Sequence, residues 1–136
     1  MNELVNWLNN HLDPPKRKKN QYDAHPLLIA SYFHWQFIRI HPFGDGNVRM
    51  ARILMNLILM ICGYVPAIVR LEKTQEYYGA LNLSEAENIA PLAEFIGEEM
   101  IISLELAIKA AKGESVEKFD DFDREIALLK QMQNIP

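Results

Sequence analysis

The chain has 136 residues, of which 49% are hydrophobic, and it carries a formal net charge of −4. This length and apolar content predict one domain with one core, and the acidic balance argues against general affinity for nucleic acid or anionic membranes. The single cysteine, Cys62, excludes an internal disulfide. Residues 1–3 start a polar segment rather than a signal peptide, so we expect a cytoplasmic protein, with a translocated effector left open.

The first forty residues predict two helices separated by a loop. Apolar residues recur at helical spacing over residues 3–12, and the Asp-Pro-Pro sequence at 13–15 ends that segment. The basic run at 16–19 is interpreted as a solvated loop rather than a binding patch. A second helix is predicted over residues 26–39, where the apolar surroundings of His34 favour a packed core histidine over a catalytic one.

Residues 47–62 include the most apolar stretch of the chain. Residues 53–62 are almost wholly hydrophobic, so we predict a helix that is buried nearly all round, at the centre of the fold. Gly63 is a natural residue to end this helix, and Pro66 prevents its continuation. The apolar stretch is too short to span a bilayer, so no membrane partner is expected.

Two further helices follow. The first is predicted over residues 73–83, in which Tyr77 and Tyr78 are interpreted as core residues in preference to walls of a base pocket. The second is predicted over residues 91–112, with Gly113 after its last turn. We expect no pair of strands, so the predicted fold class is all-α.

The last segment, residues 113–136, is interpreted apart from a core domain at residues 1–112. It predicts an amphipathic helix from about 115 to 133, which packs on the core, packs on another chain or leads to a missing domain. Its apolar stripe consists of Phe119, Phe122, Ile126, Leu129 and Met132.

Between the second and third predicted helices, the run at residues 41–52 concentrates groups suited to phosphate chemistry. His41 can take a proton from an attacking hydroxyl near neutral pH. Asp45 offers a hard oxygen ligand for Mg²⁺ shared with phosphate oxygens. Glycines at positions 44 and 46 let the backbone approach a ligand closely. We expect Phe43 to bury its ring and thereby to aim His41.

The start of the helix predicted over 47–62 adds donors to this run. A helix N-terminus presents unpaired N–H groups and a positive dipole end, which suit an anion. Asn47 can cap the helix or donate to an oxyanion. Arg49, Arg52 and Asn56 share one helix face and suggest a phosphate clamp. Each feature alone has an ordinary structural explanation, but their combination favours a phosphate site.

The run resembles the motif of the Fic family, written His-x-Phe-x-Asp/Glu-Gly-Asn-Gly/Lys-Arg-x-x-Arg. The matching residues are His41, Phe43, Asp45, Gly46, Asn47, Arg49 and Arg52. Val48 departs from the motif, and its β-branched side chain adds bulk beside the expected phosphate site. The resemblance covers about residues 1–110. It implies a Fic-type helical bundle around a buried central helix, whereas neither the family's β-hairpin flap nor its inhibitory motif is evident in this chain.

The resemblance also implies an activity, the transfer of AMP from ATP to a Ser, Thr or Tyr hydroxyl of a target protein. In that reaction His41 is the base and Asp45 holds Mg²⁺. The expected nucleotide-binding residues are Phe43, Gly44, Gly46, Asn47, Val48, Arg49 and Arg52.

Three alternatives to AMP transfer stay open at this stage. They are transfer of UMP, phosphocholine or phosphate, a nucleotide-binding or toxin–antitoxin module with little catalysis, and a fragment inactive without further domains. The expected partners are the target protein and an inhibitory helix or antitoxin supplied by another segment or chain. A homodimer is left open, and nucleic acid is expected only through a domain outside this chain.

Overall fold

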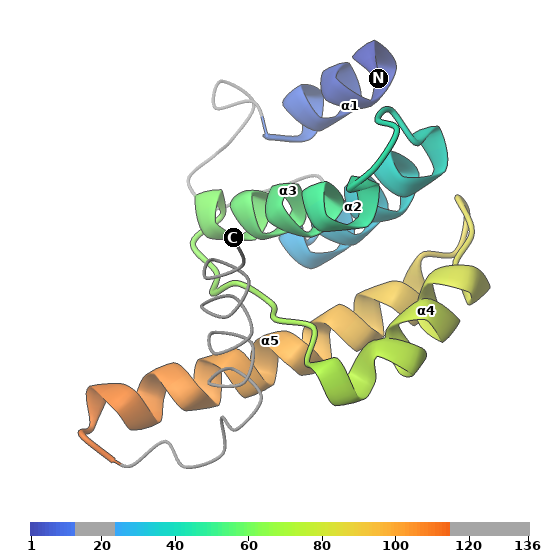
Figure 1. Ribbon diagram of the computed structural model, residues 1–136. Coiled ribbons are helices and arrows are strands. Elements are labelled where there is room, and N and C mark those ends of the chain that lie inside the picture. Colours follow the sequence, from blue (N-terminus) through green and yellow to red (C-terminus); the bar gives the residue numbers. More distant parts are fainter. Residues whose placement is uncertain (13–23, 115–136) are drawn as a thin grey trace, which may run out of the picture.

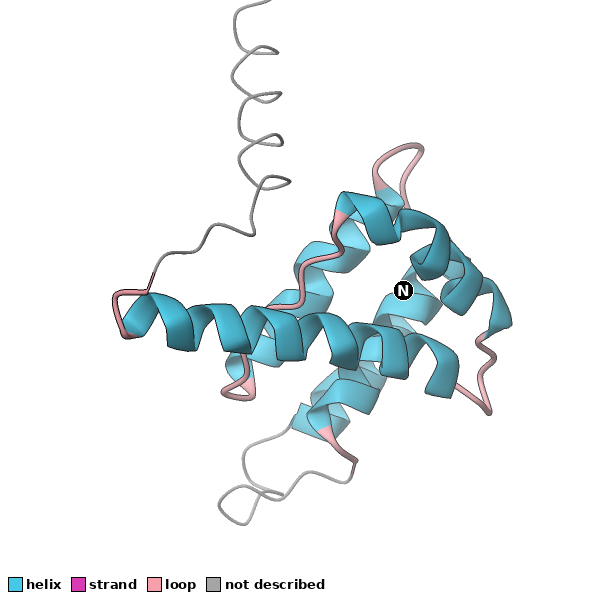
Figure 2. Ribbon diagram, turned by 90° about the horizontal axis from the view of Figure 1, so that it is seen from below, coloured by secondary structure: helices cyan, strands magenta, loops and turns pink. Residues whose placement is uncertain are grey.

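The computed structural model describes residues 1–12 and 24–114, which fold into helices joined by loops (Figures 1 and 2). The elements are α1 Asn2–Leu12, α2 Pro26–Ile40, α3 Asn47–Ile61, η2 Leu71–Lys73, α4 Thr74–Leu83 and α5 Ala90–Ala111. These residues contain no strand, only an isolated bridge between Glu85 and Asn88. The all-α prediction is confirmed, and the helix expected at 115–133 lies outside the described residues.

Helix α2 has clear signals at both ends. Nδ1 of His25 accepts a hydrogen bond from the backbone N–H of Leu27, at 3.2 Å, and Pro26 follows in the first turn. At the other end His41 adopts the left-handed conformation, with φ 51° and ψ 58°, and its N–H donates to the Phe37 carbonyl at 3.1 Å. The chain therefore leaves the helix at His41, and the loop of residues 41–46 begins there.

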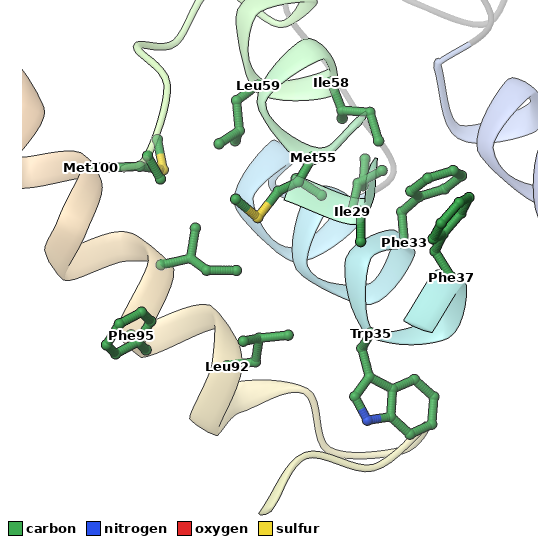
Figure 3. Close-up of a cluster of buried hydrophobic side chains, with 14 of the residues drawn as sticks. Ile29, Phe33, Trp35, Phe37, Met55, Ile58, Leu59, Leu92, Phe95 and Met100 are labelled. Atoms are coloured by element: carbon green, nitrogen blue, oxygen red, sulfur yellow. The ribbon is translucent and has the colours of Figure 1, made fainter. Parts of the chain in front are cut away.

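Helix α2 is the centre of the packing because it contacts α1, α3 and α5. Figure 3 shows the core where side chains of α2, α3 and α5 meet. The labelled residues are Ile29, Phe33, Trp35 and Phe37 from α2, Met55, Ile58 and Leu59 from α3, and Leu92, Phe95 and Met100 from α5. Burial of each large apolar side chain contributes about 1.5–3 kcal/mol, so this cluster holds the three helices in place.

Helix α3 is not buried all round, and on this point the sequence-based expectation is wrong. One face packs on α2, and Ala51, Met55 and Leu59 of α3 are buried; Figure 3 labels Met55 and Leu59. The opposite face carries four apolar side chains that are between 52% and 57% exposed: Ile53, Leu57, Met60 and Ile61. Residues 53–62 are apolar on both the packed and the open face, so the sequence could not show which face stays open.

The segment between α3 and α4 is held to the helices by polar contacts. Gly63, with φ 85°, ends α3 as predicted, and the Tyr64 N–H donates to the Leu59 carbonyl at 2.9 Å. The Asn56 side chain donates to the Ala67 carbonyl at 3.0 Å and accepts from the Ala67 N–H at 2.9 Å. The predicted clamp of Arg49, Arg52 and Asn56 is therefore wrong at Asn56, because its amide serves the backbone.

Candidate active site

The N-terminal end of α3 borders a pocket of about 490 Å³. Its lining residues are Ile38, His41, Gly44, Asp45, Gly46, Asn47, Val48, Arg49, Arg52 and Tyr78. Every site residue expected from the sequence, except Phe43 and Asn56, is in this set. The folded chain thus brings a histidine, a carboxylate and two guanidinium groups around one cavity.

The first turn of α3 directs backbone donors toward this cavity. Gly46 precedes the helix with φ 77° and ψ 14°, a conformation that a side chain would strain. Within the described chain no side chain caps this end, and the first backbone bond of the helix joins the Met50 N–H to the Gly46 carbonyl at 2.9 Å. The N–H groups before Met50 have no partner inside the helix, so this terminus suits an anion.

Asn47 holds the loop rather than capping the helix. It is 4% exposed, and its Oδ1 accepts a hydrogen bond from the Phe43 N–H at 3.0 Å. Its Nδ2 donates to the Phe43 carbonyl at 2.7 Å. Both ends of the amide are therefore occupied by one backbone residue, which closes the turn between positions 43 and 47. The side chain therefore does not cap the helix, which is one of the two roles that the sequence allows for it.

Phe43 does not bury its ring, which corrects a second expectation. The residue is 52% exposed, and its ring lies with the centroid 6.4 Å from that of Phe37, at the edge of the core. The backbone of Phe43 is anchored instead, through the Asn47 amide. The position of His41 is thus determined by its own left-handed backbone and by the closed turn, not by a buried aromatic ring.

Asp45 is the one carboxylate among the residues that line the pocket. It is exposed, and its Oδ1 accepts a hydrogen bond from the Gly46 N–H at 2.7 Å. No group of three His, Cys, Asp or Glu residues in the described chain could hold a metal alone. Mg²⁺ commonly binds through one or two carboxylates together with substrate phosphates, so this donor set fits a magnesium-bound nucleotide rather than a metal site made by the protein alone.

The two arginines lie at different depths. Arg49 is exposed, whereas Arg52, one turn further along α3, is half-buried with its Cζ atom 4.7 Å from the ring centroid of Tyr77. Tyr77 is fully buried and hydrogen-bonded to His34, which confirms that both belong to the core. Tyr78 is 43% exposed and lines the pocket, so the expectation of core packing is wrong for this residue.

A larger cavity, of about 800 Å³, lies between the start of α2, residues 63–65 and α5. Its walls are mainly apolar, and the ionisable carboxylates among its lining residues are Glu94 and Glu98. Carboxylates repel phosphate, and the cavity lacks a histidine or an arginine. The smaller pocket at α3 is therefore the candidate active site.

Comparison with known proteins matches residues 1–59 to the model of the Fic/DOC family. A protein adenylyltransferase Fic from Aedes aegypti is 36% identical over 98 residues, which are 72% of this chain and 18% of the relative. The protein of that name from Drosophila persimilis is 31% identical over 134 residues, or 98% of this chain and 23% of the relative. The chain thus spans about a fifth of the length of these curated relatives.

Solved structures agree with this result. A Fic domain-containing signalling protein from Bacteroides thetaiotaomicron superposes with a TM-score of 0.75 and 34% identity, over 87% of this chain and 47% of that one. Fic-1 from Caenorhabditis elegans gives a TM-score of 0.69 and 31% identity, over 84% of this chain and 32% of that one. The motif, the helical fold and these similarities lead to one conclusion: the chain belongs to the Fic/DOC family.

Proposed function

We propose that this chain transfers AMP from ATP to a hydroxyl group of a target protein. The observation that carries the proposal is that His41, Asp45 and the start of α3 meet in one pocket of about 490 Å³. Relatives named protein adenylyltransferase support the same activity. The target is a protein with an exposed Ser, Thr or Tyr.

The pocket has separate groups for the separate parts of the nucleotide. The uncapped first turn of α3 offers N–H donors to the α- and β-phosphates. Arg49 and Arg52 line the same pocket and offer charge-assisted hydrogen bonds to the outer phosphates. Asp45 would hold Mg²⁺, which when bound neutralises charge on the phosphates. Tyr78 forms a further wall and is suited to stack on the base.

The reaction follows from the exposed position of His41. Its imidazole takes the proton of the target hydroxyl, and the hydroxyl oxygen bonds to the α-phosphorus. The bond between the α-phosphorus and the bridging oxygen breaks, and pyrophosphate leaves. A base in this position contributes roughly 10²–10⁴-fold to the rate. The donors that hold the outer phosphates keep the leaving group in place, so the attack can occur in line.

Intact-mass spectrometry tests the proposal. The chain is incubated with Mg²⁺, a cell lysate and either ATP, UTP or CDP-choline, and each protein that gains mass is identified. We expect the mass of AMP to be added with ATP and no gain with the other two donors. His41→Ala should abolish the gain while calorimetry still shows ATP binding, because the imidazole acts on the hydroxyl and not on the nucleotide.

Other outcomes would contradict the proposal in distinct ways. A gain of UMP or phosphocholine would assign another donor to the same site. ATP binding without any transfer would indicate a nucleotide-binding module. Transfer by His41→Ala at the wild-type rate would remove the histidine from the mechanism.

A further inference from the structure

Beneath the candidate active site, Tyr77 of α4 and His34 of α2 form a polar pair that solvent does not reach. Each residue is 0% exposed, and the Tyr77 hydroxyl is hydrogen-bonded to Nε2 of His34. The two rings meet edge to face, with centroids 5.7 Å apart. Buried polar side chains destabilise a core unless their hydrogen bonds are made, and an apolar pair would fill this space without that requirement. The pair therefore suggests a role beyond packing.

Arg52 lies directly on this pair. Its Cζ atom is 4.7 Å from the centroid of the Tyr77 ring, within the range of a cation–π interaction. Its Nε is buried and has no hydrogen-bond partner in the described part of the chain. The same residue lines the pocket. The guanidinium is thus held at the boundary between the core and the pocket by the face of an aromatic ring.

Both members of the pair are neutral at physiological pH. Burial lowers the pKa of His34 to about 4 and raises the pKa of Tyr77 to about 12. Arg70 shows the alternative, because its guanidinium binds the Glu99 carboxylate through two hydrogen bonds of 3.0 Å. A carboxylate would compete with phosphate for the arginine, whereas a neutral aromatic face fixes the guanidinium and leaves its charge available to an anion.

We propose that Tyr77 and His34 are positioning residues that hold the Arg52 guanidinium at the pocket for the terminal phosphate of the nucleotide. Tyr77 supplies the surface on which the guanidinium rests. His34 fixes the Tyr77 hydroxyl and thereby the plane of the ring. The inference rests on the proposed function, in which Arg52 binds an outer phosphate. Arg49, one turn earlier on the same helix, is exposed and in this respect contrasts with the half-buried Arg52.

Titration of ATP and ADP into the full chain tests the inference. Arg52→Ala should weaken ATP binding by about ten- to a hundredfold and affect ADP less, since a charge-assisted contact to the terminal phosphate is lost. Tyr77→Leu removes the ring and should weaken ATP by about three- to tenfold, again with a smaller effect on ADP. Tyr77→Phe keeps the ring but loses the hydrogen bond to His34. Its affinity for ATP should lie between those of Tyr77→Leu and wild type.

Two sets of controls separate positioning from general stability. Ser84→Ala also removes a buried hydroxyl near α4, one that bonds to the Ala80 carbonyl and the Leu92 N–H, but it lies outside the pocket. It should leave the ratio of the ATP and ADP dissociation constants unchanged. His34→Gln keeps a neutral hydrogen-bonding group and should restore most of the preference for ATP that His34→Leu loses.

An NMR measurement reads the position of Arg52 without nucleotide. The Nε–H resonance of Arg52, assigned by its loss in Arg52→Lys, should be displaced by the ring current of Tyr77. We expect this displacement to vanish in Tyr77→Leu and to persist in Ser84→Ala. An unmoved resonance in Tyr77→Leu overturns the inference. An unchanged ratio of ATP to ADP affinity in Tyr77→Leu also overturns it, if Arg52→Ala does alter that ratio.

Failure of the proposed function would look different. If Arg52→Ala leaves the preference for ATP over ADP unchanged, Arg52 does not bind the terminal phosphate, and the assignment of the pocket is wrong. The resonance in Tyr77→Leu and Tyr77→Phe then still decides whether the pair positions the guanidinium. If Tyr77→Leu does not fold, the Tyr77→Phe and His34→Gln variants carry both measurements.

Discussion

The loop of residues 41–46 and the buried polar groups of the core use the same chemical groups in opposite ways. His41 is exposed in the loop, whereas His34, on α2 seven residues earlier, is fully buried and bonded to Tyr77. Asp45 is exposed at the pocket, whereas Glu99 is 2% exposed and binds Arg70 through both carboxylate oxygens. The surroundings of each group, and not its chemical type, distinguish a group that is open to a ligand from one that serves the structure.

This contrast predicts which property each substitution changes. Changes in the interior should lower the free energy of unfolding and, apart from changes at Tyr77 and His34, which support Arg52, should leave the pocket groups in place. Changes in the loop or in the first turn of α3 should alter nucleotide binding with a smaller effect on stability. Three substitutions test the contrast, from the largest expected effect to the smallest.

Arg70→Ala should lower the free energy of unfolding by about 3–5 kcal/mol, because it leaves the Glu99 carboxylate buried without its partner. Glu72→Ala is the matched control. It removes the exposed partner of the same arginine, 2.9 Å from Nη1, and should change stability by less than about 1 kcal/mol. Urea unfolding measures both. Equal losses in the two variants would contradict the distinction between the buried and the exposed carboxylate.

Acid should destabilise the fold through His34. Its pKa is about 4 in the folded chain against an ordinary value of 6.5, so the unfolded chain binds more protons between these values. The contribution of His34 is complete above pH 6.5 and is lost as the pH falls toward 4, by roughly 3 kcal/mol in total. Unfolding of wild type and His34→Gln at pH 7 and pH 4.5 measures this. Identical pH dependence of the two would show that His34 does not contribute.

Val48→Gly should have the smallest effect on the fold and a modest effect on the site. Val48 lines the pocket and also packs partly against the core. Removal of its side chain should raise the affinity for ATP or the rate of transfer by roughly threefold, which corresponds to less than about 1 kcal/mol. Stability should fall by about 0.5–1 kcal/mol, since glycine loses more backbone entropy in a helix. Calorimetry measures ATP binding, and a transfer assay measures the rate. An unchanged or lower value of both would show that the site already accommodates valine.

The order and bounds of the helices could be predicted because strong local signals mark their ends. Pro26 lies in the first turn of α2, Gly63 follows α3 with a positive φ, and Gly113 does the same after α5. Those residues act through their own backbone preferences, which do not depend on the rest of the fold. No helix end in the described residues therefore differs from the predicted one by more than one residue.

What could not be predicted depends on contacts between segments. The open face of α3 follows from the placement of α2 on the other side, and Tyr78 enters the pocket from α4, outside the motif. The errors at Phe43 and Asn47 have a related cause. Sequence reasoning gave the aromatic ring the anchoring role, but a short amide four residues later reaches the Phe43 backbone through two hydrogen bonds.

His41 is the one residue other than glycine in the described chain that adopts a positive φ. For such a residue the left-handed conformation costs of order 1–3 kcal/mol relative to the regions that side chains prefer. The φ torsion of His41, together with the turn closed by Asn47, therefore fixes where the imidazole leaves the main chain. In the proposed reaction, any change that lets this torsion relax, even with the histidine intact, would turn the base away from the phosphorus, so the accuracy of catalysis would depend on the main chain.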